Sequence, residues 1–167
     1  MKTLYILRHA KSSWEDPDLA DFDRPLNARG LSAAPFMGDL IAAKGYEPSI
    51  ILCSPAERAK QTAELVTKHA GIGAKIQFDP RVYEASPNAL RQVVSEIDDS
   101  IDSAMLVGHN PGIEGFIRYL TNEIEAMPTA ALAVINTEID SWGDINAGCG
   151  TLTTVYRPKD EAAKQDI

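Results

Sequence analysis

The chain alternates short apolar runs with helical patterns, and three of its helical patterns begin with a polar residue followed by proline. The three pairs are Ser54-Pro55, Ser86-Pro87 and Asn110-Pro111. Such a pair is typical of a helix start, because the polar side chain caps free amides and proline suits the first helical position. Strands that alternate with helices predict a three-layer α/β fold, with a largely parallel central sheet and helices on both faces.

The apolar runs give the expected positions of the strands. Four runs are expected to form the parallel part of the sheet, at residues 4–7, 49–53, 75–78 and 104–107. Two later runs, 132–135 and 151–156, are expected to add an antiparallel edge. Asn27 is expected to cap a helix that ends near Gly45 and either begins near Pro35 or is kinked there, since proline removes a helical hydrogen bond.

The length and composition fit one globular domain over residues 1–157. With 44% hydrophobic and 24% charged residues, a chain of 167 residues can bury a core without disulfides. Residues 158–167 are charged and led by proline, which predicts a frayed C-terminal tail. Cys53 and Cys149 lack the spacing of metal ligands, so free thiols and no metal site are expected.

Charge and hydropathy exclude several classes of partner. The formal charge of -8 disfavours binding to nucleic acid, which requires a basic face. No apolar run is long enough to span a membrane and no secretory signal begins the chain, so we expect a cytoplasmic protein with no membrane partner. A phosphorylated ligand would require a local cluster of arginines to overcome the acidic surface.

Five side chains with catalytic potential follow the strands, at the edge where parallel α/β sheets bind ligands. They are Arg8, His9, Arg58, Glu84 and His109. Two arginines can bind the oxygens of a phosphoryl group through paired donors, and one histidine can attack its phosphorus atom. The positions of these residues therefore predict a phosphoryl-transfer site at this edge, with His9 as the reactive centre.

Arg58 supports this interpretation through its place in a helix. It lies in the first turn, where the helix dipole favours negative rather than positive charge. A bound anion would explain a cation there. Taken alone, Arg58 fits equally well a surface arginine paired with Glu57 or with a nearby acid.

Four motifs resemble those of the histidine phosphatase superfamily, the phosphoglycerate-mutase-like proteins, and occur in the same order. They are Leu7–Ala10, Pro25–Gly30, Ser54–Ala63 and Val107–Asn110. The resemblance covers roughly residues 1–120. Within the superfamily, the short chain and the Arg-His-Ala-Lys-Ser opening look most like the SixA-type phosphohistidine phosphatases.

The resemblance implies a role for each of the five side chains. His9 is expected to be the nucleophile and to carry the phosphoryl group transiently, while Arg8, Arg58 and His109 bind that group. Glu84 is at the position where many relatives keep the acid that protonates the leaving group; the alternative is an exposed loop glutamate. No metal and no cofactor are expected.

Two departures from the family pattern bear on the substrate. Ala10 replaces the usual glycine after the nucleophile, which requires a negative φ or an uncrowded backbone. Glu15 stands where mutase relatives often have asparagine, which argues against mutase activity. The chain is also too short for the inserted caps that enclose sugar phosphates in relatives, so an open site for a phosphorylated protein side chain is expected.

Three functions therefore remain open. The first is a metal-independent phosphatase that dephosphorylates phosphohistidine on a protein, such as a phosphorelay component. The second is a phosphomonoesterase that uses the same pocket for a small phosphorylated molecule, and the third is a non-catalytic phosphate-binding module. Loops such as residues 14–24 are expected to recognise the body of the substrate.

Overall fold

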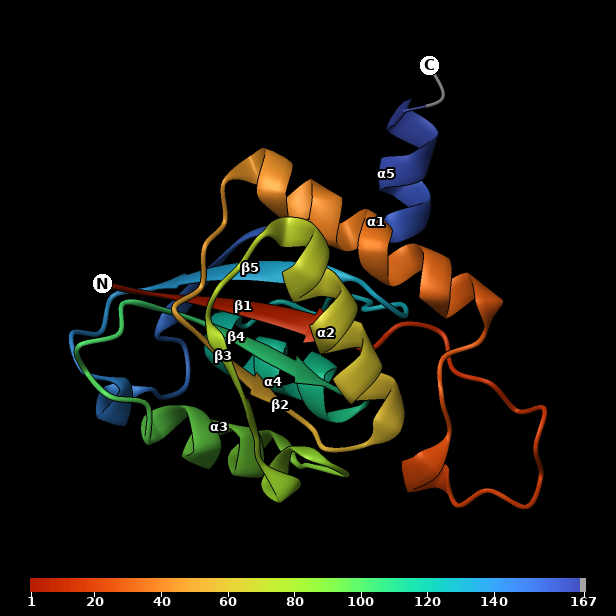
Figure 1. The fold of residues 1–167 in the computed structure, drawn as a ribbon. Helices are drawn as coiled ribbons and strands as arrows, with labels where there is room; N and C mark the ends of the chain where they lie inside the picture. The colour runs from red at the N-terminus through yellow and green to blue at the C-terminus, as the bar shows by residue number, and fades with distance from the viewer. Residues whose placement is uncertain (166–167) are drawn as a thin grey trace.

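The computed structural model describes residues 1–165 and has a six-stranded sheet with helices on both faces (Figure 1). The strand order is β3-β2-β4-β1-β5-β6. The strands are β1 (Lys2–Arg8), β2 (Ile50–Cys53), β3 (Lys75–Phe78), β4 (Ser103–Gly108), β5 (Leu132–Thr137) and β6 (Gly150–Tyr156). The first four strands in this order are parallel, and β5 and β6 are antiparallel. The expected largely parallel sheet with an antiparallel edge is confirmed.

Five α-helices surround the sheet in the described residues. They are α1 (Ala28–Lys44), α2 (Glu57–Ala70), α3 (Pro87–Ser95), α4 (Gly112–Thr121) and α5 (Pro158–Gln165). Strand β1 shows how the layers form, because successive side chains point to opposite faces. Leu4 and Ile6 pack in the core beneath α3 and α4, whereas Tyr5 and Leu7 pack in the core beneath α1 and α2.

Helix α1 is capped as expected. The side chain of Asn27 accepts a hydrogen bond from the Gly30 amide, and Gly45 ends the helix with a φ of 74°. The helix runs through Pro35 without an end there. The carbonyl that loses its partner belongs to Leu31, which is 49% exposed, so water can reach this side of the helix.

Helix α2 begins later than predicted. We expected Ser54 to cap it, with Pro55 as its first residue, but the helix starts at Glu57 after Ala56. The Ser54 hydroxyl accepts a hydrogen bond from the Ala56 amide at 3.2 Å and also contacts Nε2 of His109 at 2.7 Å. Ser54 thus combines a local contact with one to a residue 55 positions away.

The expected frayed tail is wrong for residues 158–165, which form α5 beside α1 (Figure 1). The pattern of a helix is present in the sequence: proline comes first, Asp160 and Glu161 lie in the first turn, and Lys164 lies in the last. Pro158 and Ala162 line a shallow hollow together with Phe36 of α1. Residues 166 and 167 lie outside the described part of the chain.

Two further features of the described residues concern the whole chain. No helix within residues 1–165 is long and apolar enough to cross a membrane. Cys53 is buried, and both Cys53 and Cys149 are free thiols.

Gly30 provides a test of the packing that places the N-terminal segment. A side chain at Gly30 would clash with the backbone carbonyl of Lys11, two residues after His9. Gly30→Ala should lower the free energy of unfolding by about 1–3 kcal/mol, because the overpacked backbone must shift. Chemical denaturation measures this change. Gly73→Ala is the matched control, since nothing lies within 4 Å of its added Cβ; equal stability of the two variants would contradict this packing argument.

Candidate active site

Two neighbouring parallel strands bring the histidines together. Arg8 ends β1 and pairs in register with Gly108, the last residue of β4. His9 and His109 follow directly, and their ring centroids are 5.0 Å apart. Arg58, from the first turn of α2, lies close enough for its charge to lower the pKa of both rings. The structure thus gathers four of the five predicted side chains around one point.

His9 is buried and has a defined tautomer. Its Nδ1 lies 2.7 Å from the carbonyl oxygen of Ala10, which can only accept, so Nδ1 carries the proton. Nε2 therefore keeps its lone pair. Burial lowers the pKa of His9 to about 3; the Ala10 hydrogen bond opposes this shift, and the charges of His109, Arg58 and Arg8 add to it. At neutral pH the ring is therefore neutral, with a lone pair on Nε2.

The backbone at Ala10 tolerates its methyl group. Ala10 is fully buried, and its amide donates to the Thr62 hydroxyl at 2.9 Å. The residues with positive φ in the described chain do not include Ala10. The replacement of the family's glycine therefore introduces no left-handed strain at this position.

His109 is oriented by Ser54. Its Nε2 lies 2.7 Å from the Ser54 hydroxyl, and its Nδ1 is buried without a hydrogen-bond partner in the protein. Burial lowers the pKa of His109 to about 4, helped by the charges of Arg58 and Arg8 and opposed by Asp21. The neutral ring can donate one hydrogen bond from Nδ1 while Nε2 accepts the serine proton.

The buried donors that lack partners are concentrated at this site. Arg8 donates from Nη1 to the Met127 carbonyl at 3.0 Å, yet its Nε is unpaired. Within residues 1–165, the buried side-chain nitrogens without a partner belong to Arg8, Arg24, Arg58 and His109, and one acceptor, Oδ1 of Asn110, is also unpaired. Buried polar groups are normally hydrogen-bonded, so this cluster of donors indicates a ligand rich in acceptor oxygens.

Sequence reasoning missed Arg24, which is buried to 6% exposure. One of its nitrogens donates to the Ser12 hydroxyl at 2.7 Å, while Nε and Nη1 have no hydrogen-bond partner. The ring of Trp14 covers the guanidinium at 3.4 Å and is itself 72% exposed. The acid-rich sequence around Arg24 is typical of a solvated loop, and only its place just before the Pro25–Gly30 motif hinted at a role.

Glu84 lies on the surface and borders the same hollow as His109. It is exposed and lines a hollow of about 440 Å³ with Asp21, Arg58, Tyr83 and His109, among others. Its φ of 52° is in the left-handed region, which is unfavourable for a residue with a side chain. Strained backbone of this kind tends to occur at functional sites.

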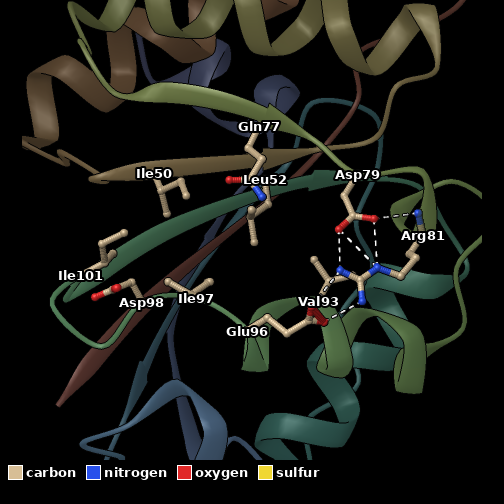
Figure 2. Close-up of a pocket in the computed structure, with 10 residues that line it drawn as sticks. All are labelled: Ile50, Leu52, Gln77, Asp79, Arg81, Val93, Glu96, Ile97, Asp98 and Ile101. Carbon is tan, nitrogen blue, oxygen red and sulfur yellow. Dashed lines mark hydrogen bonds and ion pairs between the residues drawn. The ribbon is translucent and has the colours of Figure 1, made fainter.

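An ion-pair network anchors the segment that carries Tyr83 and Glu84, and Figure 2 shows it. Arg81 contacts Asp79 at 2.7 Å and Glu96 of the α3 region at 2.6 Å. The Asp79 amide donates to the carbonyl of Cys53, where β2 ends. These contacts border a separate hollow of about 320 Å³. Its lining is half apolar and half polar: Ile50, Leu52, Val93, Ile97 and Ile101 on one hand, and Gln77, Asp79, Arg81, Glu96 and Asp98 on the other.

Known proteins resemble this chain in sequence and in fold. The sequence model of the histidine phosphatase superfamily (branch 1) matches residues 4–105, more than half of the chain. An uncharacterised protein of Mycobacterium tuberculosis is 32% identical over 164 residues, which cover 92% of this chain and 100% of the relative.

Two solved structures extend the comparison. The candidate phosphohistidine phosphatase SixA of Agrobacterium tumefaciens is 30% identical, with a TM-score of 0.82 over 94% of this chain and 98% of that chain. A protein histidine phosphatase SixA complexed with tungstate shares the fold at 20% identity, with a TM-score of 0.79 over 95% and 99% of the two chains. The chain therefore belongs to the histidine phosphatase superfamily and, within it, to the SixA-type branch of phosphatases.

Proposed function

We propose that this protein is a metal-independent phosphatase that dephosphorylates phosphohistidine on a protein through a phosphohistidine intermediate at His9. The observation that carries the proposal is the set of unpaired buried donors beside the free Nε2 of His9. A phosphoryl group matches this set, since its oxygens accept hydrogen bonds and its phosphorus accepts the nucleophile.

The first step transfers the phosphoryl group to His9. Its Nε2 attacks phosphorus, the bond from phosphorus to the substrate nitrogen breaks, and the leaving imidazole takes up a proton. Arg8, Arg58 and the Nδ1–H of His109 stabilise the charge on the phosphoryl oxygens, which is the main requirement of phosphoryl transfer. Water then attacks the phosphorus atom, the bond to Nε2 breaks, and inorganic phosphate leaves.

The hydrogen bond from Nδ1 of His9 supports this reaction. The Ala10 carbonyl at 2.7 Å holds the ring and stabilises the positive charge that the ring gains when Nε2 is phosphorylated. Pre-organisation of this kind accelerates the reaction because the nucleophile needs no reorientation.

Glu84 is our candidate for the acid that assists the leaving group. Its exposed position at the mouth of the hollow is where the body of a bound substrate would lie. A phosphoramidate nitrogen needs less help from such an acid than an alkoxide does, so the importance of Glu84 depends on the substrate. A phosphomonoesterase would depend on it strongly.

Exposed aromatic side chains beside the site favour a protein over a small molecule as the substrate. Trp14 and Phe22, at 72% and 38% exposure, present aromatic side chains from the loop beside the site. Exposed aromatic residues of this kind are typical of surfaces that contact other proteins.

Replacement of the nucleophile and of one phosphate ligand tests the mechanism. His9→Ala should abolish turnover, and Arg58→Ala should lower kcat/KM on the order of 10²-fold or more, because a charge-stabilising donor is lost. Steady-state kinetics measure both changes. His69→Ala, on the outer part of α2 with Asp39 at 3.4 Å, should retain activity as the control; near-normal turnover by His9→Ala would refute the mechanism.

The depressed pKa of His9 predicts the acid limb of the pH profile. Protonation removes the nucleophilic lone pair, so activity falls only when the pH drops toward the folded-state pKa of about 3, well below the ordinary 6.5. After correction for titration of the substrate, kcat/KM should therefore show no loss from His9 between about pH 7 and pH 5. A limb centred near 6.5 in the corrected profile would show that His9 titrates normally.

A substrate panel distinguishes the two phosphatase functions. With EDTA present, wild type and Glu84→Gln are compared on a phosphohistidine-bearing phosphotransfer domain and on phosphomonoesters. We expect the phosphohistidine to be preferred, with less than about ten-fold loss of kcat in Glu84→Gln, since its leaving group needs little acid assistance. Preference for an ester, lost in Glu84→Gln, would identify a phosphomonoesterase; no turnover of either would favour a binding module.

A further inference from the structure

Asp21 connects the loop of residues 14–24, called the rim loop below, to Arg58. Its side chain accepts a hydrogen bond from Nη2 of Arg58 at 3.0 Å, and its backbone carbonyl accepts one from Nη1 at 2.7 Å. The Tyr83 hydroxyl donates to the same carboxylate at 2.7 Å. One residue of η1 (Asp21–Asp23) thus contacts both α2 and the segment that carries Glu84.

The same carboxylate also lies near the second buried arginine. Nε of Arg24 is 3.5 Å from Oδ1 of Asp21. Arg24 and Arg58 are each only 6% exposed. Burial lowers the pKa of Arg24, the charge of Arg58 adds to this effect, and Asp21 opposes it. Asp21 is therefore a counter-ion shared by two buried cations that would otherwise repel each other.

The contacts also determine which edge of Arg58 is free. Both terminal nitrogens of its guanidinium donate to Asp21, whereas Nε is buried and unpaired. A guanidinium has five N–H donors in a rigid plane, so fixing one edge fixes the direction of the others. Asp21 thereby sets the orientation of the donors that remain available to a phosphoryl group.

Asp21 is itself held firmly, although half of its side chain is exposed. The base of its loop is tied by the Ser13 amide, which donates to the Pro25 carbonyl at 2.7 Å, and by the Leu26 amide, which donates to Gln61 at 2.7 Å. The hydrogen bond from Tyr83 is the main cause that lowers the pKa of Asp21, with Arg58 adding to it. A loose surface ion pair would have neither constraint.

We propose that Asp21 is a positioning residue for phosphoryl transfer, which holds Arg58 and Arg24 in the arrangement that binds the phosphoryl group. The inference rests on the proposed function and adds a residue to it. Asp21 acts through the two arginines. Because Asp21 belongs to the rim loop, the position of that loop affects the affinity of the site for phosphate.

The test measures binding of inorganic phosphate and of vanadate by calorimetry, together with kcat and KM. Asp21→Ala should weaken binding of both anions about ten-fold to a hundred-fold and lower kcat by a similar factor, because Arg58 loses charge-assisted contacts. Asp21→Asn should recover part of this loss, since its amide oxygen still accepts from Arg58 and Tyr83. Tyr83→Phe, which keeps the ring, should cause a smaller loss.

Asp18→Asn is the matched control, because Asp18 is an exposed acid of the same loop. It should leave anion affinity and kcat unchanged. Thermal melts report whether each variant is folded, and if Asp21→Ala does not fold, Asp21→Asn and Tyr83→Phe still test the proposal.

Two outcomes would overturn the proposal. Tighter anion binding in the Asp21 variants, at unchanged kcat, would show that Asp21 competes with the phosphoryl group for Arg58. Unchanged binding and kcat in folded variants would show a purely structural ion pair.

Binding of inorganic anions is measured without turnover, so this test is separate from that of the proposed function. An inactive wild type whose anion affinity depends on Asp21 would contradict the proposed function but not the positioning role.

Discussion

The parallel pairing of β1 with β4 is the contact on which the rest of the site depends. Arg8 and Gly108 are register partners, so the residues that follow each strand emerge side by side at the same edge of the sheet. This pairing places His9 beside His109, with ring centroids 5.0 Å apart, although the two residues are 100 positions apart in the chain. Apolar side chains fill both faces of the sheet, and this close packing keeps the strand ends rigid. The histidines are thus positioned by the centre of the core rather than by a flexible loop.

Concentrating cations in an acidic protein requires local compensation. Three arginines and two histidines gather at one edge of a chain whose formal charge is -8. Two acidic side chains offset the repulsion between the arginines, and the two histidine rings are neutral. Asp21 lies between Arg58 and Arg24, and the charge of Glu114 supports Arg8. Burial and the neighbouring cations lower the pKa of both histidines, so neither adds a further charge at neutral pH. Positive potential is thereby concentrated at this edge while both imidazole rings stay neutral.

The parts of the fold and of the site that could be predicted are those that depend on local pattern. Alternating apolar runs and helix-start pairs identified the layers of the sheet, and the arginines and histidines at strand ends identified four residues that the structure brings together. Prediction failed where distant contacts compete with local preference. Ser54 was expected to cap α2, but the helix starts at Glu57, and the Ser54 hydroxyl is shared between the Ala56 amide and His109. The tail is a different case: it was expected to fray, yet residues 158–165 form a helix beside α1 whose pattern is present in the local sequence.

By itself, the sequence determined the type of fold, the chemistry of the reactive groups and the edge of the sheet at which they lie, because hydrophobic period and helix-start residues act over a few positions. Only the tertiary structure decided how those groups are oriented. The contacts of Asp21 with Arg58 and Tyr83 join residues 37 and 62 positions apart, and the ring of Trp14 covers the buried guanidinium of Arg24. No local pattern encodes these contacts, since they form only when the packed core has set the distance between the elements that carry them.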